Sequence, residues 1–425
     1  MTQSVQTVRT FRNTLLSLAL VMAVVFLPSC QKTKLGHNFL PLTERLISDT
    51  TSSWYYPLSA FNPKSVDGTI ALFGASDEVA RMTEYLLTAD NFNNVDGSSR
   101  PDSLPDFAGE IFAPVLDIAN TPYQQYISEN SEALLGDIAV RAFLSAIDTA
   151  VYTVPADSLK SYPRTKAKMV VFPSSLFAAY GAADIDTLNA ISGRKVPVVF
   201  TPNAMVEYLY SRHSQGMNVG VLTTSDIMGA GVYSSVFPSI MKKYGDESTN
   251  YYVFCPDTAR SESAKLNAFL SMFETSGVGG KLSAIIVDDS TVDLGDMREA
   301  VDALISSVSA QDAPYRNLLA SDFEMVDPMK AVSTVCYKYL RTKNLFTHRI
   351  SYPEVKCYAA MPSYAVKGAQ MDVVGDLEYS FKYGRTPDDG PSVFSVVPLR
   401  DEYISRAFLE YMETYTQNLF SLYVR

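Results

Sequence analysis

Residues 169–172 read MVVF, and four similar apolar runs follow: VPVVF at 196–200, VGVLT at 219–223, YYVF at 251–254 and LSAIIV at 282–287. Each run is continuous rather than alternating, which is typical of strands buried on both faces of a parallel sheet. Each gap between runs has room for a helix, so right-handed βαβ units are expected. The pattern predicts an α/β fold with mainly parallel sheets flanked by helices. Its most apolar positions are expected to be fully buried: Val199, Val221, Ile285 and Ile286.

The same alternation of predicted strands and helices extends outward from this stretch. Upstream, TIALF at residues 69–73 predicts a strand, followed by a helix at 78–87. The other expected helices lie at 131–150, 176–190, 204–213, 233–244, 264–274, 297–308, 330–340 and 403–422. The other expected strands are short and lie at 111–116, 355–359, 371–374, 379–383 and 393–397.

Composition limits the kind of protein this can be. Hydrophobic residues make up 47% of the 425 residues and charged residues 19%, which excludes a disordered chain because there is ample apolar mass for a core. The net charge is −11, so the chain lacks the cations that nucleic-acid binding requires. We therefore expect no nucleic-acid partner.

The N-terminus has the features of an export signal. Arg9 and Arg12 precede an apolar run at 15–27 that is too short to span a bilayer in the usual way. The sequence Leu-Pro-Ser-Cys at 27–30 resembles the bacterial lipoprotein cleavage box, in which the cysteine is acylated. Residues 1–29 are then a signal peptide, Cys30 is the lipidation site, and 30–66 form a tether. An uncleaved anchor helix is the alternative.

Either form of the N-terminus places the protein in the cell envelope, attached to a membrane. The basic residues just after Cys30, Lys32 and Lys34, favour a periplasm-facing position over a surface-exposed one. An oxidising compartment permits a disulfide, for which Cys336 and Cys357 are the best pair, leaving Cys255 over. Three buried thiols are an equally good interpretation.

Small polar residues follow nearly every predicted strand. Ligands of open parallel sheets bind at the carboxyl ends of the strands, so these residues are candidates for a ligand site. They also suit the capping of the next helix, which remains the plainer interpretation of each one. The candidates are Ser76, Asp77, Ser174, Ser175, Thr201, Asn203, Ser225, Asp226 and Asp288.

An acidic loop offers a second candidate site. Asp102, Asp106 and Glu110 are spaced four residues apart in a segment rich in Pro and Gly. Such carboxylates suit acid–base catalysis or a hard cation if they converge, and they form a solvated rim if they do not. We expect the loop near the cleft, with at most two of the acids facing it. The three histidines do not suggest a zinc site, and neither a resident metal nor a cofactor is predicted.

The lipoprotein box and the βα-repeating body together resemble the type 1 periplasmic solute-binding proteins. The stretches MVVFPSS, VPVVFTPN, VGVLTTSD, YYVFCPDT and AIIVDDS carry the resemblance. It implies two lobes, at 67–218 and 219–315, with a C-terminal segment at 316–425 packed on them.

The resemblance also implies a function. A small polar solute would be held between closing lobes by the strand-end residues, with a membrane transporter or sensor as a possible partner. A lipid-anchored hydrolase that uses Asp102, Asp106 and Glu110 is the alternative, and a purely structural envelope lipoprotein is a third.

Overall fold

The structure is a computed structural model that describes residues 38–256, 261–277 and 279–423. Its contacts divide the chain into two units, Met1–Phe39 and Leu40–Arg425, and the fold below is that of the second unit. The predicted signal peptide, Cys30 and the start of the tether lie outside the described residues. Among the residues described, no helix is long and apolar enough to cross a membrane.

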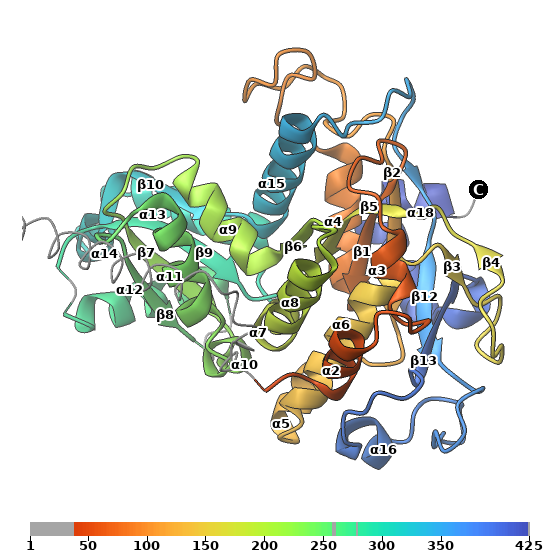
Figure 1. Cartoon of the computed structure of the whole chain (residues 1–425). Helices are drawn as coiled ribbons and strands as arrows, with labels where there is room; N and C mark the ends of the chain where they lie inside the picture. The colour runs from red at the N-terminus through yellow and green to blue at the C-terminus, as the bar shows by residue number, and fades with distance from the viewer. Residues whose placement is uncertain (1–37, 257–260, 278, 424–425) are drawn as a thin grey trace, which may run out of the picture. The chain divides into compact units, whose positions relative to one another are not determined.

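Within the described residues, the strands form two main sheets, which establishes the two-lobed α/β architecture (Figure 1). The larger sheet has the order β13-β12-β2-β1-β5-β6, and β11 pairs with β2 beside this path. All its pairings are parallel except β12 with β13. Its strands are β1 (Thr69–Gly74), β2 (Ile111–Asp117), β5 (Ala167–Phe172), β6 (Val198–Phe200), β11 (Glu354–Val355), β12 (Tyr358–Pro362) and β13 (Phe394–Pro398).

The smaller sheet has the order β10-β9-β7-β8, and every pairing in it is parallel. The chain enters this sheet after β6 and leaves it after β10, so the two lobes are joined by two crossings. β10 lies beyond the expected end of the second lobe at residue 315. The strands are β7 (Asn218–Thr223), β8 (Asn250–Phe254), β9 (Leu282–Asp288) and β10 (Leu319–Val326).

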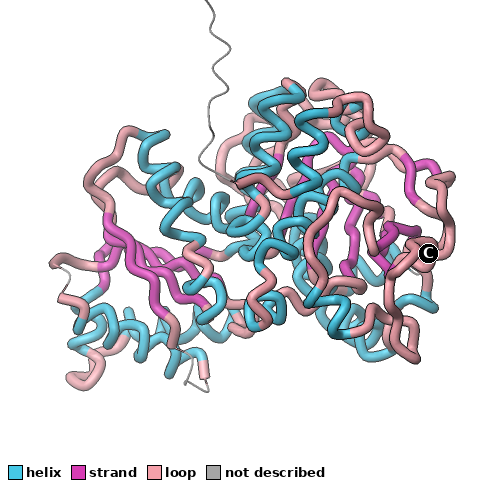
Figure 2. The backbone as a smooth tube through the Cα atoms, turned by 60° about the horizontal axis from the view of Figure 1, so that its bottom comes forward, coloured by secondary structure: helices cyan, strands magenta, loops and turns pink. Residues whose placement is uncertain are grey.

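Helices lie along both sheets, as the cyan tubes beside the magenta strands show (Figure 2). The larger lobe contains α2 (Pro41–Ser48), α3 (Tyr56–Ala60), α4 (Ser76–Thr88), α5 (Gln124–Ser128), α6 (Glu132–Ile147), α7 (Ser175–Tyr180), α8 (Ala182–Ser192), α15 (Pro328–Lys343), α16 (Tyr379–Gly384), α17 (Arg406–Tyr415) and α18 (Gln417–Tyr423). The smaller lobe contains α10 (Ser225–Gly229), α11 (Val232–Tyr244), α12 (Glu262–Thr275), α13 (Leu294–Ser306) and α14 (Ala313–Leu318). The helix α9 (Thr201–Tyr210) forms part of the first crossing, between β6 and β7, and packs on α15 and α11.

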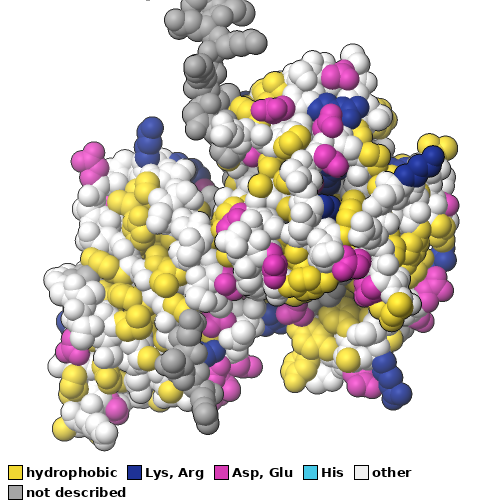
Figure 3. Space-filling view, turned by 90° about the horizontal axis from the view of Figure 1, so that it is seen from below, with side chains coloured by type: hydrophobic (Ala, Val, Ile, Leu, Met, Phe, Trp, Pro, Cys, Tyr) yellow, Lys and Arg dark blue, Asp and Glu magenta, His cyan; other side chains and the backbone are white. Residues whose placement is uncertain are grey.

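The burial of the central strands explains why their sequences are continuously apolar. Val221, Ile285 and Ile286 are fully buried and Val199 is 7% exposed, which confirms the expected core. Because helices cover both faces of each sheet, neither face of these strands requires polar residues. The acidic surplus lies on the surface, where Asp and Glu side chains are spread over the face seen from below (Figure 3).

Several expected elements differ in the structure. The expected helix at 176–190 is divided into α7 and α8 at Gly181, where a Cβ atom would come within 2.4 Å of Ala139 on α6. The expected strand at 379–383 is wrong, because Glu378 caps a helix there by accepting a hydrogen bond from Phe381 N. At 371–374 the described backbone forms only one bridge, from Met371 to Leu377.

The C-terminal helix is also divided, into α17 and α18. Ser405 caps α17 through Phe408 N, and Glu84 of α4 accepts hydrogen bonds from the first residues of α18. A separate cap for each segment explains why one long helix does not form. The proposed disulfide is wrong as well, since Cys336 and Cys357 are both thiols, and burial raises the pKa of each to about 12.

Candidate functional site

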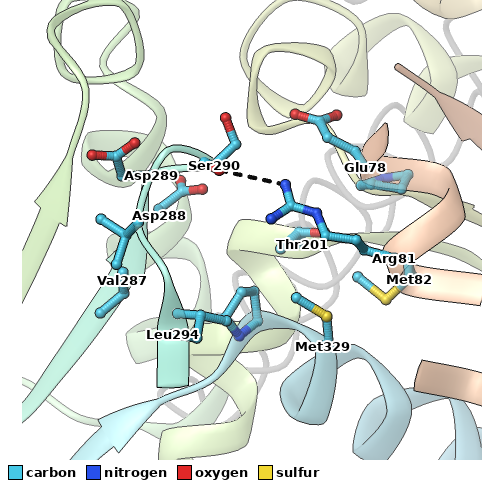
Figure 4. Close-up of a pocket in the computed structure, with 13 residues that line it drawn as sticks. Glu78, Arg81, Met82, Thr201, Val287, Asp288, Asp289, Ser290, Leu294 and Met329 are labelled. Carbon is cyan, nitrogen blue, oxygen red and sulfur yellow. Dashed lines mark hydrogen bonds between the residues drawn. The ribbon is translucent and has the colours of Figure 1, made fainter. Parts of the chain in front are cut away.

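A cavity of about 80 Å³ lies where the carboxyl end of β9 in the smaller lobe meets the beginning of α4 in the larger lobe (Figure 4). It is the kind of position, beyond the carboxyl ends of parallel strands, where α/β proteins bind ligands. Glu78 and Arg81 of α4 reach it from one side, and Asp288 and Asp289 from the other. Thr201, the first residue of α9, and Met329 of α15 complete its wall. We call this space the inter-lobe cavity.

Glu78 is positioned by the turn between β1 and α4. Gly74 ends the strand, and α4 begins at Ser76, so Glu78 lies in the first turn of the helix beside the sheet edge. Its Oε2 atom is buried and receives no hydrogen bond from any described residue. Burial, together with the nearby carboxylates of Asp77 and Asp288, raises the pKa of Glu78 to about 8, although Arg81 opposes the shift. Glu78 is therefore largely protonated at neutral pH.

Asp288 is the last residue of β9 and faces the other lobe. Ser175 Oγ, at the start of α7 in the larger lobe, lies 2.8 Å from both of its carboxylate oxygens. Tyr233 of α11 donates a hydrogen bond of 2.7 Å to Oδ2. Burial raises the pKa of Asp288 to about 6, although both hydroxyl donors work against the shift. The carboxyl group thus bridges the lobes and changes charge just below neutral pH.

Arg81 supplies the positive charge of the cavity. Its Nη2 atom donates to Ser290 O at 3.4 Å, the contact drawn as a dashed line in Figure 4, and lies 3.6 Å from Asp77 Oδ2. Its Nε atom is buried and has no hydrogen-bond acceptor among the described residues. The guanidinium group lies between the carboxyl groups of Glu78 and Asp288 in Figure 4. It therefore has capacity left for an anionic ligand group.

A second buried acid lies at the carboxyl end of the neighbouring strand β2. Asp117 accepts hydrogen bonds from Tyr123 Oη at 2.8 Å and from the backbone and side chain of Asn120. Burial raises the pKa of Asp117 to about 6. Tyr123 is also within electrostatic reach of Glu78, whose charge raises the pKa of Tyr123. Asp117 and Tyr123 thus extend the group of buried polar side chains from Glu78 further into the larger lobe.

The strand-end residues predicted from the sequence are only partly brought together. Thr201 and Asp288 line the cavity, Ser175 bonds to Asp288, and Asp77 pairs with Arg81. The others do not line the inter-lobe cavity: Ser76 opens α4, Ser174 precedes α7, Asn203 lies in α9, and Ser225 and Asp226 open α10.

The acidic loop is not at this site. Glu110 directly precedes β2 and so lies at the amino end of that strand, whereas the cavity is at the carboxyl ends. Its carboxylate lies 2.6 Å from Lys168 Nζ and accepts Thr347 N at 2.9 Å. The expectation that the loop lies near the cleft is wrong.

The other two acids of the loop, Asp106 and Asp102, accept hydrogen bonds from nearby backbone N–H groups. Asp106 accepts the backbone N–H groups of Asn91 and Phe92, each at 2.9 Å, and Asp102 accepts Asn94 N at 2.8 Å. Because each of the three carboxylates binds different donors, they do not form one catalytic group. Within the described ranges, no three His, Cys, Asp or Glu side chains are grouped as metal ligands. The alternative hypothesis, a hydrolase that uses Asp102, Asp106 and Glu110 together, is therefore wrong.

Sequence reasoning missed Glu78, Arg81, Asp117, Tyr123 and Tyr233. Glu78 and Arg81 are three residues apart in the helix after the first strand, so both lie on one helical face. Extending the strand-end rule by one helical turn would have found this pair. No sequence pattern indicates Tyr233, because it lies in α11, which follows β7, whereas Asp288 ends β9.

Comparisons with known proteins do not show a family for this chain. No protein-family model and no curated protein matches the chain. Among solved structures, glutamate racemase from Francisella tularensis in complex with D-glutamate is 15% identical, with a TM-score of 0.41, over 72% of this chain and 90% of that one. Glutamate racemase from Aquifex pyrophilus is 14% identical, with a TM-score of 0.36, over 75% and 95%. An aspartate racemase homologue from Pyrococcus horikoshii is 11% identical, with a TM-score of 0.33, over 65% and 99%.

These findings correct the interpretation of the body as a solute-binding protein. The similar structures named above are racemases, not solute-binding proteins, although identities this low concern the fold alone. The geometry also differs from the expected one, because only Thr201 and Asp288 of the nine predicted ligand residues line the inter-lobe cavity. The resemblance to the periplasmic proteins holds only at the level of two α/β lobes.

Proposed function

We propose that the inter-lobe cavity is the active site of an enzyme that moves protons on a small carboxylate substrate. The observation that carries the proposal is the pairing of Glu78 and Asp288. These carboxyl groups come from different lobes, line one cavity, and have pKa values raised to about 8 and about 6. Two acids whose environments separate their pKa values are the usual basis for assigning an acid and a base.

The protonation states follow from these pKa values. Near pH 7, Glu78 keeps its proton and Asp288 has largely lost its own. Asp288 is then the general base and Glu78 the general acid. The pKa of each group lies close to neutral pH, where a catalytic acid or base is most efficient. Proton transfer should be fastest between about pH 6 and pH 8, because it requires both states at once.

Arg81 determines the class of substrate. Its guanidinium group lies between the two acids, and a carboxylate bound to it would place the adjacent carbon between them. Asp288 would remove the proton from that carbon, the electron pair would pass to the carboxylate beside Arg81, and Glu78 would deliver a proton to the carbon. The net result is exchange of one carbon-bound hydrogen with solvent, with inversion of the carbon when the two acids act on opposite faces.

The experiment is hydrogen–deuterium exchange at carbon. The full chain is incubated in D2O at pD near 7 with small carboxylates, including both enantiomers of glutamate, aspartate, alanine and lactate. Loss of the α-proton signal is followed by NMR. We expect exchange in at least one compound, and a rate reduced by about 100-fold or more in Glu78→Gln and in Asp288→Asn.

Glu274→Gln is the matched control, because Glu274 is an exposed acid on α12. It makes the same chemical change outside the cavity and should leave the rate unaltered. The proposal fails if none of the compounds exchanges, or if both cavity variants exchange as fast as the control.

A further inference from the structure

A separate cavity of about 220 Å³ lies between α9, α15 and the loop that follows α4. We call it the α9–α15 cavity. It shares no lining residue with the inter-lobe cavity. The polar residues that matter in its wall are Ser99, Arg212, Lys330, Thr334 and Lys338.

Helical spacing brings the cationic groups together. Lys330, Thr334 and Lys338 are four residues apart, so they lie along one face of α15. Arg212 comes just after the last turn of α9, and α9 packs closely on α15. The loop that carries Ser99 closes the third side.

The charges in this wall do not balance. Arg212 Nε donates to Glu324 Oε2 at 3.0 Å, but the ammonium groups of Lys330 and Lys338 make no ion pair or hydrogen bond with any described residue. The one carboxylate of the described wall, Asp90, already accepts the N–H groups of Asp102 and Ser103, each at 2.9 Å. Burial and the nearby charge of Arg212 also lower the pKa of Lys338, the direction expected where like charges face one another.

We propose that the α9–α15 cavity binds a small phosphate dianion, either free or as a phosphomonoester. Two unpaired ammonium groups and a guanidinium group supply the charge, and the hydroxyl groups of Ser99 and Thr334 supply neutral donors. Phe92 and Pro101 in the same wall give an apolar surface for an organic substituent. The net charge of −11 repels anions from the molecule as a whole, so binding requires this local cluster.

The test is calorimetric titration of the full chain with inorganic phosphate and with methyl phosphate at low ionic strength. We expect saturable binding at one site. Lys330→Gln/Lys338→Gln should weaken it by about tenfold or more, since two charge-assisted contacts are lost. Lys338→Arg should keep the affinity within about threefold because it preserves the charge. Tighter binding of methyl phosphate identifies a phosphomonoester as the ligand, and tighter binding of phosphate identifies the free ion.

Lys64→Gln/Lys281→Gln is the control, because both lysines are exposed and lie outside this cavity. It removes the same charge and should leave binding unchanged. The proposal is overturned if neither probe gives saturable heat, or if the two double variants lose affinity equally, which would show a general charge effect. These outcomes do not depend on the carbon exchange reaction, because the two cavities share no residue.

Discussion

At the carboxyl end of β1, Glu78 keeps its proton at a pH where an exposed glutamate has lost it. The cause is position, since its Oε2 atom is buried without a hydrogen-bond donor among the described residues and two carboxylates lie nearby. Such a group destabilises the fold whenever it is charged, which is the cost of holding an acid in the cavity.

The pH dependence of stability should reveal this group. The pKa of Glu78 is raised from 4.5 to about 8, so between these values the folded chain holds a proton that the unfolded chain has released. Stability therefore falls as pH rises through this window. Glu78→Gln should be more stable than the parent by on the order of 2 kcal/mol at pH 8.5, with little difference at pH 4.5.

Urea unfolding at the two pH values measures this difference. Glu274→Gln, at an exposed acid, should show no pH-dependent change. An equal effect of Glu78→Gln at both pH values would show that the carboxyl group is not held protonated.

At the scale of elements, the amino ends of the larger sheet are tied together by Lys168 of β5. Its Nζ atom lies 2.6 Å from Glu110 Oε2 and donates to Val66 O at 2.9 Å and Leu345 O at 2.7 Å. Both charged side chains are about 1% exposed. One ammonium group thereby connects β5 with the segments before β1 and β2 and with the segment after α15.

Lys168→Met should lower the free energy of unfolding by about 3–5 kcal/mol, because it leaves the Glu110 carboxylate buried without its cation. Equilibrium denaturation in urea measures the change. Arg406→Met breaks the exposed pair with Glu410 and should have almost no effect. A loss as small as that of the exposed pair would mean that the buried pair contributes little to stability.

At the scale of the whole molecule, the two lobes are joined by two crossings and by contacts across the inter-lobe cavity. Ser175 with Asp288 and Arg81 with Ser290 O are the polar contacts across the cavity. The active site that we propose therefore exists only when both lobes are in place. Attachment to a membrane is a separate matter, because Cys30 lies outside the described residues and its lipidation stays a prediction from the sequence.

Cys30→Ala tests the anchor. Bacteria that express the full chain in the presence of radioactive palmitate should label the parent protein but not this variant. Cys357→Ala should still be labelled, because Cys357 is part of the larger lobe, with a pKa raised to about 12 by burial. Unchanged labelling of Cys30→Ala would exclude the lipoprotein interpretation.

The sequence by itself determined most strands of both sheets and their mainly parallel pairing, but it did not predict β10 of the smaller sheet. Runs such as those at 169–172 and 282–287 are apolar at every position, and only burial on both faces explains that. The sequence also identified Asp288, because a polar residue directly after such a strand lies at the ligand-binding edge. It failed at 379–383, where aromatic residues suggested a strand but Glu378 caps a helix.

Only the tertiary structure decided which acids act together. Asp102, Asp106 and Glu110 are close in sequence, yet each turns toward different donors. Glu78 and Asp288 are 210 residues apart, yet they line one cavity. The physical reason is that a carboxyl group's pKa and partners depend on burial and on charges brought from distant segments, which no local pattern records.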